Sequence, residues 1–483
     1  MTPLIDVDWW ALGPGLALSG GAMLLMLLEF VPAGRNSSRG ALVALASLLA
    51  AAACVWRVHE VKRALFDGMF VHDTFTVFFT LLFCGIAALS VLLSWDYVKR
   101  MRINQAEYYA LLLAATLGMI VMSASNDLIT IFLGLELMSL ALYVLVGFRR
   151  SRLESNEAAM KYFLLGAFAS GFLLYGIALL YGATGTTHLE RMAAFLAGSP
   201  LLSNPLLLMG GLLVLVGLGF KVAAVPFHMW TPDAYEGAPT TVTGYMSAGA
   251  KAAGFAALLR LALVALPDLQ ASWKPVLIAI AALTMTVGNV TALLQTNLKR
   301  MLAYSSIAHA GYVLVAVVAG GNEGAAAAVF YLAIYSLMNL GAFGIVALLG
   351  RDQDEPVLLS DLAGLGFKNP ALAFALTIFM LSLGGIPPTA GFMGKFYVFR
   401  AAVQAGQIPL VIVGVLNSVV SIFYYLRVTV ALYMEEPAGE PTAVSRSIPA
   451  VIGVVVSLAL TLWWGLQAHA LLEQAQRSVL GLM

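Results

Sequence analysis

Fourteen long stretches of mainly apolar residues follow one another along this chain, and they constrain its fold more than any other feature. A helix that crosses a bilayer needs about 20 such residues, because its backbone polar groups find no water in the lipid. The stretches are 10–31, 40–57, 75–95, 107–124, 126–148, 158–182, 206–228, 238–263, 274–295, 301–320, 326–349, 371–400, 407–433 and 448–470. The first has no small-residue cleavage site, so we expect a permanent span rather than a signal peptide. The pattern predicts an all-α integral membrane protein with about 14 transmembrane helices.

The composition excludes several other classes of protein. Of 483 residues, 61% are hydrophobic and 11% are charged, against about 25% charged in an ordinary soluble domain. A net charge of +1 disfavours a nucleic-acid binder. The loops between the stretches are too short to hold a nucleotide, a flavin or a cluster. Cys54 and Cys84 lack the spacing of a disulfide framework or an iron–sulfur motif, so we expect no cofactor and no metal in this chain.

The basic residues between the stretches predict an orientation, because Lys and Arg concentrate on the cytoplasmic side. The loops that follow odd-numbered spans contain thirteen basic residues: Arg35, Arg39, Lys99, Arg100, Arg102, Arg149, Arg150, Arg152, Lys299, Arg300, Arg351, Lys368 and Arg446. The opposite side has seven: Arg57, Lys62, Arg63, Arg191, Lys274, Arg400 and Arg477. The excess predicts that the odd-numbered loops are cytoplasmic. Both termini would then lie outside, in the periplasm for a protein of the bacterial inner membrane.

Six basic residues fall inside the predicted spans, and a charge at the bilayer centre costs about 2.5–3.5 kcal/mol on insertion scales. They are Lys161, Lys221, Lys251, Arg260, Lys395 and Arg427. Glu136 is the one carboxylate near the middle of a span. Lys161 and Arg260 are close enough to a span end to reach water by snorkelling, and Glu136 could belong to a static ion pair. Lys221 and Lys251 lie too deep for snorkelling, which favours a function.

Two predicted spans are interrupted. Pro226 and His228 end the seventh span, and residues 384–391, with three glycines and two prolines, break the twelfth. A simple kink would explain either break, because proline removes a helix hydrogen bond. Two broken spans, each beside a lysine, are also typical of transporters built from inverted repeats. We therefore expect a single transmembrane domain, 1–483, containing two five-helix repeats, 107–263 and 274–433.

Lysines and a glutamate buried together can move protons. Burial disfavours the charged form of an amine, whereas a nearby carboxylate favours it. A change in the protonation or distance of Glu136 would therefore make Lys221 take up or release a proton. His228 and His309 could also relay protons, although His309 could equally be a polar core residue. Six scattered histidines show no pairing typical of haem ligands.

Three segments carry a resemblance to a known family: Gly217–Pro239, Gln295–Tyr312 and Ile386–Tyr397. They resemble subunit N of bacterial NADH–quinone oxidoreductase, the respiratory complex I, and the likeness extends over essentially the whole chain. The first two segments are shared with the wider superfamily of antiporter-like proteins. Lys395, in place of a carboxylate, and the short C-terminus favour subunit N over its sister subunits L and M.

The resemblance implies a proton-translocating membrane-arm subunit without a redox centre of its own. It implies that Glu136 pairs with Lys221, that Lys251 links them to Lys395 on the exit side, and that Lys161 tunes the Glu136–Lys221 pair. FMN, iron–sulfur clusters and quinone would belong to partner subunits of the complex, where NADH is oxidised. Three alternatives remain: a subunit of an Mrp-type cation/proton antiporter, the membrane arm of a hydrogenase, and a purely structural subunit.

Overall fold

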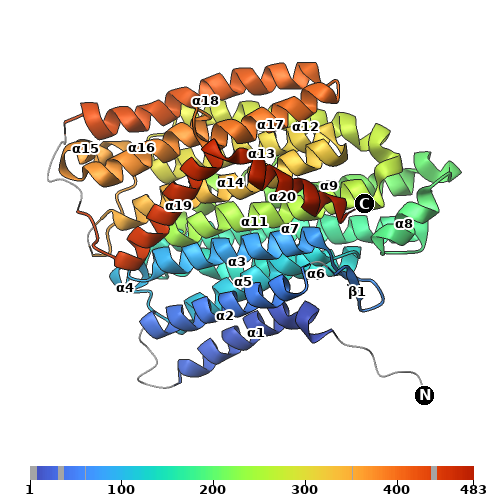
Figure 1. Ribbon diagram of the computed structural model, residues 1–483, viewed down its shortest axis with the longest axis horizontal. Helices are drawn as coiled ribbons and strands as arrows, with labels where there is room; N and C mark the ends of the chain where they lie inside the picture. Colours follow the sequence, from blue (N-terminus) through green and yellow to red (C-terminus); the bar gives the residue numbers. More distant parts are fainter. Residues whose placement is uncertain (1–7, 31–36, 60, 351, 437–442, 483) are drawn as a thin grey trace.

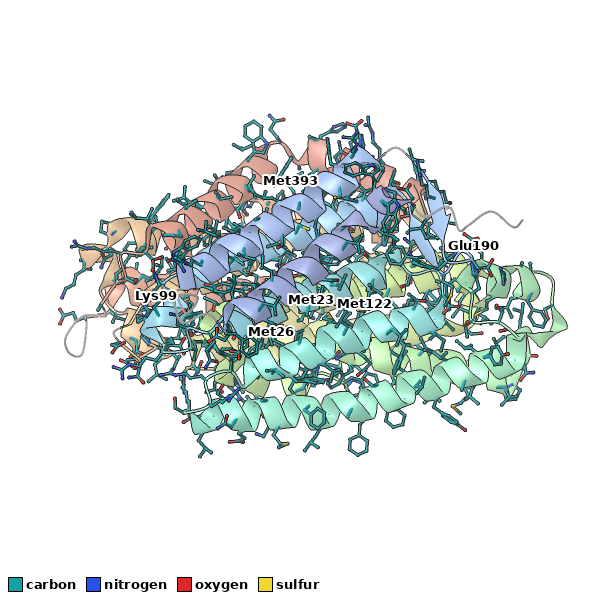
Figure 2. All side chains as sticks on the ribbon, turned by 90° about the horizontal axis from the view of Figure 1, so that it is seen from below. Met23, Met26, Lys99, Met122, Glu190 and Met393 are labelled. Atoms are coloured by element: carbon teal, nitrogen blue, oxygen red, sulfur yellow. The ribbon has the colours of Figure 1, made fainter. Side chains whose placement is uncertain are left out.

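The structure is a computed structural model that describes residues 8–30, 37–59, 61–350, 352–436 and 443–482. Most of its helices run side by side along the longest axis of the molecule (Figure 1). The short helices α4 (Tyr97–Arg100) and α15 (Leu365–Lys368) mark one end, here called the α4 end. The hairpin of β1 (Arg63–Leu65) and β2 (Phe70–His72) and the helix α8 (Leu189–Leu196) mark the opposite end, called the α8 end. Lys99 and Glu190 lie at these two ends in Figure 2.

Thirteen described helices are long and apolar enough to cross a membrane. They are α1 (Trp9–Leu28), α2 (Ser37–Arg57), α3 (Thr74–Ser94), α5 (Ala106–Ala124), α6 (Leu128–Val146), α7 (Leu153–Thr184), α9 (Pro205–Val222), α11 (Thr240–Arg260, extended by a π-helical turn Leu261–Ala265), α12 (Gln270–Leu293), α13 (Leu298–Ala319), α14 (Gly321–Leu348), α18 (Ile408–Met434) and α19 (Ile448–Leu466). The shorter elements are α10 (Trp230–Gly237), α16 (Pro370–Gly384), α17 (Ala390–Gln404), α20 (Ala468–Leu480), β1 (Arg63–Leu65) and β2 (Phe70–His72).

The predicted fold class is confirmed. Each of the fourteen predicted spans has a helical counterpart, and the twelfth, 371–400, is the broken pair α16 and α17. The first span ends at Leu28 rather than at 31, which lies outside the described residues together with Arg35 and Arg351.

Several predicted boundaries are wrong, and polar residues on helices explain most of the errors. The span predicted at 158–182 begins five residues earlier, because Glu154 and Glu157 lie on α7 itself. Lys299 and Arg300, predicted in a loop, belong to the first turn of α13. Hydropathy also misses the hairpin and α20, because the strands have three residues each and α20 is amphipathic.

Asp and Asn side chains determine where several spans begin. Asp127 accepts hydrogen bonds from the backbone N–H groups of Ile129 and Thr130 at the start of α6, at 2.8 and 3.3 Å. Asp73 caps α3 and Asn297 caps α13 in the same manner. These caps satisfy backbone donors that a helix leaves unpaired in its first turn.

The centre of the molecule is formed by α11, α13 and α14. In the most apolar stretch of α13, and likewise in that of α14, 94% of the residues are buried within the chain. The corresponding share for α19 is 28%. Small residues allow neighbouring helices to approach closely: a Cβ atom added to Gly176 of α7 would lie 2.7 Å from the backbone nitrogen of Val214 in α9. Such contacts are typical of membrane helices, where lipid provides no hydrophobic drive for association.

Both predicted breaks exist. The helix α9 ends at Val222, Ala223 has a left-handed φ of 61°, and α10 begins at Trp230. The helix α16 ends at Gly384, Gly385 has φ 83°, and α17 begins at Ala390. Side chains satisfy the exposed carbonyl groups at both places, as backbone at membrane depth requires. Trp230 Nε1 donates to the Phe220 carbonyl at 2.9 Å, and Lys395 Nζ donates to that of Gly384 at 2.8 Å.

Candidate functional site

Lys221 lies at the end of α9, directly before the first break, and 2% of its surface is exposed. Its Nζ is 3.5 Å from the Tyr143 hydroxyl of α6. The same amine lies 5.4 Å from the centre of the Tyr143 ring and 5.6 Å from that of Tyr162. Aromatic faces attract a cation weakly and without a formal counter-charge. The environment therefore tolerates both the charged and the neutral amine.

Glu136 lies two turns before Tyr143 on the same helix and accepts a hydrogen bond from Ser170 of α7. Glu136 is half-buried, and its carboxylate lies near enough for its charge to act on both Lys221 and Tyr143. The structure thus brings together the predicted pair Glu136 and Lys221, with Tyr143 as a shared neighbour.

Lys251 occupies the middle of α11 and is 2% exposed. Its Nζ donates to the Ser306 carbonyl of α13 at 2.6 Å and to the hydroxyl of the same residue. That hydroxyl also accepts a hydrogen bond from Tyr335 of α14 at 2.8 Å. Lys251 lies 6.0 Å from the ring centre of Tyr235, which belongs to an aromatic group that also reaches Lys221: Tyr162, Phe220, Trp230 and Tyr235.

His309 follows Ser306 by three residues on α13 and is 3% exposed. Its Nδ1 is 2.8 Å from the Tyr331 hydroxyl, and its Nε2 is 3.0 Å from the Tyr425 hydroxyl of α18. A phenol can donate or accept, so either ring nitrogen can carry the proton. His309 lies between the surroundings of Lys251 and those of Lys395.

Lys395 lies on α17, just after the second break. Its Nζ donates to the Ser418 hydroxyl of α18 at 2.8 Å and approaches that of Ser421 at 3.4 Å. The amine is also 4.9 Å from the ring centre of Tyr312 in α13. Tyr312 in turn accepts from the Asn289 amide, at 3.3 Å, and the Asn289 oxygen accepts from Tyr424, at 3.0 Å. The ring centre of Tyr424 is 4.4 Å from that of Tyr425, which contacts His309, so polar side chains extend from Lys395 back to His309.

The two remaining predicted residues occupy different surroundings. His228 is half-buried within the first break, near enough for the charge of Lys251 to act on it. Lys161 is partly exposed on α7 and forms ion pairs with Glu157 at 2.7 Å and with Asp233 at 2.9 Å. The direct partners of Lys161 are therefore these carboxylates, and its predicted influence on the Glu136–Lys221 pair stays a prediction.

Two other charges inside the spans have structural partners. Snorkelling is the wrong explanation for Arg260, which is 2% exposed and pairs with the equally buried Asp73 at 3.0 Å. Its Nε also donates to the Ser123 carbonyl. Arg427 donates to the carbonyl groups of Leu293 and Gln295 at the end of α12, where a cation also suits the helix dipole.

The neutral groups that hold each buried amine, above all Tyr143, Ser306 and Ser418, were not predicted from the sequence. Their hydroxyls carry no charge, so no insertion cost distinguishes them from ordinary core residues. One weak signal existed, since Ser418 and Ser421 are three residues apart and therefore share a helix face. Among the described residues, no group of three or more His, Cys, Asp or Glu side chains is arranged to hold a metal ion.

Glu355, also not predicted from the sequence, lies in the segment between α14 and α16 at the α4 end. Its side chain is 3% exposed and is surrounded by Tyr97, Thr240, Arg149 and Arg152. Burial alone would raise the pKa of Glu355. The charge of Lys299, hydrogen bonds from Tyr97 and Thr240 and the charge of Arg149 outweigh burial and lower the pKa below its ordinary value.

Comparison with known proteins identifies relatives of the whole chain. The family model described as NADH:quinone oxidoreductase/Mrp antiporter, transmembrane, matches residues 125–421. NADH-quinone oxidoreductase subunit N of Trichlorobacter lovleyi is 50% identical over 461 residues, covering 95% of this chain and 94% of the relative.

Solved structures give the same result for the fold. A chain of respiratory complex I from Thermus thermophilus with bound aureothin has a TM-score of 0.81 at 38% identity, covering 95% of this chain and 98% of its own length. A chain of the Mrp complex from Dietzia sp. has a TM-score of 0.85 at 23% identity, and the match covers 99% of this chain and 98% of the Mrp chain. At that identity the second likeness concerns the fold alone.

Proposed function

This chain belongs to the NADH:quinone oxidoreductase/Mrp antiporter family of membrane subunits, and we propose that it acts as the proton-translocating subunit N of an NADH–quinone oxidoreductase. The observation that carries the proposal is the series of buried amines Lys221, Lys251 and Lys395, each bonded to neutral hydroxyl or carbonyl groups. The full-length relative at 50% identity is named as this subunit. The Mrp-type alternative has weaker support, because the Mrp chain is 23% identical.

In this proposal, Glu136 controls the protonation of Lys221. While Glu136 is charged, it favours a charged Lys221. When Glu136 is protonated or moves away, burial favours release of the proton toward Lys251. Tyr143 and the aromatic group between the two lysines exclude bulk water, so transfer depends on hydroxyl groups and single waters.

From Lys251 the proton passes along α13 to Lys395. Ser306, Tyr335 and His309 provide donors and acceptors for the first part of this path. The Tyr312 ring and the hydroxyls of Ser418 and Ser421 receive the charge around Lys395. Lys395 then releases the proton toward the exit side.

Electron transfer belongs to the rest of the assembly. In this proposal, NADH oxidation, FMN, the iron–sulfur clusters and quinone reside in partner subunits, and this chain contributes the proton path. We place the chain in the bacterial inner membrane, with the α4 end in the cytoplasm and both termini in the periplasm. Protons would then be taken up on the cytoplasmic side and released on the periplasmic side.

We also propose that 107–263 and 274–433 are two five-helix repeats of opposite orientation. Each range contains one broken helix, α9–α10 or α16–α17. The first two helices of each range also pack through glycines: Gly118 with Gly134 between α5 and α6, and Gly288 and Gly311 between α12 and α13. Lys221 and Lys395 border the two breaks, which gives the proton path one lysine at each break.

The proposal is tested by measuring protons translocated per NADH oxidised in proteoliposomes that contain the assembled complex. We expect Glu136→Ala and Lys221→Ala to lower this ratio, because each removes a group of the switching pair. Lys368→Ala is the matched control, since Lys368 is exposed at the end of α15. A normal ratio in both test variants would refute the switching role. Retained pumping after neutralisation of several lysines would favour the purely structural alternative.

A further inference from the structure

Glu355 is a deeply buried carboxylate that the proposed proton path does not use. It lies at the α4 end, in the segment that connects α14 to α16. One of its oxygens, Oε1, accepts hydrogen bonds from the Tyr97 hydroxyl and, at 2.7 Å, from the Thr240 hydroxyl. The other, Oε2, lies 3.3 Å from Arg152 and 3.7 Å from Arg149. A residue in the second half of the chain is thereby bonded to four residues of the first half.

Thr240 is the first residue of α11, the helix that carries Lys251. The residue before it, Pro239, provides no side-chain cap. Instead, the backbone N–H of Thr240 donates to the Tyr97 hydroxyl at 2.8 Å, and that hydroxyl donates to Glu355. The carboxylate therefore occupies the position of a helix cap, although it lies 115 residues away along the chain. A negative charge there also complements the positive end of the helix dipole.

Three cations keep this carboxylate ionised and in place. Arg149 and Arg152 approach it from the segment between α6 and α7. Lys299 acts on Glu355 through its charge, and its Nζ holds the turn between α10 and α11 by donating to the Ala238 carbonyl at 2.6 Å. A carboxylate held so firmly in its charged form is a poor carrier of protons. Its surroundings suit a fixed anchor.

We propose that Glu355 caps α11 from across the molecule and thereby positions Lys251 in the relay. Lys251 lies eleven residues beyond Thr240, about 16 Å along a straight helix at 1.5 Å per residue. Because α11 is one continuous buried helix, a displacement of its first turn would carry Lys251 with it and alter the contact of Lys251 with Ser306. Glu355 is thus a positioning residue for proton transfer. This inference rests on the proposed function of Lys251.

The test compares Glu355→Gln and Tyr97→Phe with the parent, using the assembled complex. Glu355→Gln keeps the shape and removes the charge, whereas Tyr97→Phe removes the hydroxyl that links the carboxylate to the Thr240 N–H. Loss of a helix cap typically costs about 1 kcal/mol, so we expect about fivefold faster hydrogen exchange at the amides of 240–243. We also expect fewer protons translocated per NADH oxidised. A role limited to folding would lower the amount of assembled complex and leave that ratio unchanged.

Asp354→Asn is the matched control, because Asp354 is the adjacent carboxylate and is exposed. It should leave both the exchange rates and the ratio at parental values. The inference would be overturned if Tyr97→Phe showed parental hydrogen exchange at the amides of 240–243 and a parental number of protons translocated per NADH oxidised. This holds even if Glu355→Gln failed to assemble. Lys251→Ala separates the two proposals. A lowered ratio in Lys251→Ala together with parental behaviour of the two capping variants would refute the capping role alone, whereas a normal ratio in Lys251→Ala would refute the relay.

Discussion

At the scale of single residues, the buried charges of this protein fall into two groups. Lys221, Lys251 and Lys395 are held by hydroxyls, carbonyl groups and aromatic rings, and none of them has a carboxylate within ion-pair distance among the described residues. Arg260 and Glu355 instead have buried partners of opposite charge. Removing a proton from an amine of the first group leaves no isolated counter-ion behind. The first group is therefore suited to transfer and the second to structure.

Breaking the buried pair of Arg260 and Asp73 should destabilise the protein strongly. We expect Asp73→Asn to destabilise the protein by about 3–5 kcal/mol, because it leaves the guanidinium of Arg260 without a counter-charge. Asparagine is itself a good helix cap, so the start of α3 is preserved. Thermal unfolding of the purified complex would measure the loss. Asp67→Asn is the control, since the pair of Asp67 with Arg191 is exposed and should contribute little. Equal midpoints for the two variants would contradict this expectation.

Glu355 should make stability depend on pH. Its pKa in the folded protein is below its ordinary value of 4.5, so the folded state favours the charged carboxylate. The resulting stabilisation is complete above the ordinary pKa and is lost as the pH falls through the lower, folded pKa. We therefore expect the melting temperature of the parent to fall more steeply between pH 6 and about pH 3 than that of Glu355→Gln. Parallel melting curves across this range would exclude the contribution.

At the scale of helices, breaks and close contacts place the functional side chains. Each break ends a helix inside the molecule, where both backbone N–H groups and side chains satisfy the last carbonyl groups. At the second break Lys395 meets this need directly, by donating to the Gly384 carbonyl. A left-handed residue, Gly385, turns the chain there, and a Cβ atom added to it would lie 2.8 Å from Lys395 Cδ. Lys395 is therefore packed directly against the second break.

The contact of α7 with α9 should tolerate no larger residue at Gly176. We expect Gly176→Ala to destabilise the protein by about 1–3 kcal/mol, because the added methyl group would meet the backbone of α9. Gly171→Ala is a control on the same helix, where no atom lies within 4 Å of the added Cβ. That change should be neutral or slightly stabilising, since alanine favours a helix. Thermal unfolding measures both, and equal stability of the two variants would contradict the close contact.

At the scale of the whole molecule, the start of α1 and the end of α20 both lie toward the α8 end (Figure 1). This agrees with an even number of crossings, with the broken twelfth span counted as one. Among the described basic residues, Lys99, Arg100, Arg149 and Lys368 lie toward the α4 end, in or next to α4, α6 and α15. The asymmetry that predicted a cytoplasmic face from sequence therefore corresponds to one end of the folded molecule.

Orientation can be tested by labelling single cysteines. We expect Asp352→Cys, near the α4 end, to react with a membrane-impermeant maleimide only in inside-out vesicles. Asp67→Cys, in the hairpin at the α8 end, should react only in right-side-out vesicles. Both positions are exposed, with 63% and 86% of the side-chain surface accessible. The parent, with Cys84 buried and Cys54 partly buried, measures the background. The opposite labelling pattern would invert the proposed direction of proton transfer.

The sequence by itself determined the class of protein, the spans, the two breaks and the burial of Lys221, Lys251 and Lys395. Each of these depends on local features, namely the length of an apolar run, a proline, or one charge within lipid-facing sequence. The resemblance to a family rested on three longer segments of the sequence. The roles of the seven candidate residues stay predictions. Boundaries were less certain, because Glu154 and Lys299 continue helices into regions that hydropathy assigns to loops.

Only the tertiary structure decided which groups meet. Lys251 contacts Ser306, which is 55 residues away along the chain. Arg260 pairs with Asp73 over a separation of 187 residues, and Glu355 bonds to Thr240 over a separation of 115 residues. Such contacts depend on the rotation and depth of each helix against its neighbours, and these are set by the packing of small side chains over the whole bundle. Hydropathy is almost indifferent to helix rotation, so it indicates that a charge is buried and leaves its partner undetermined.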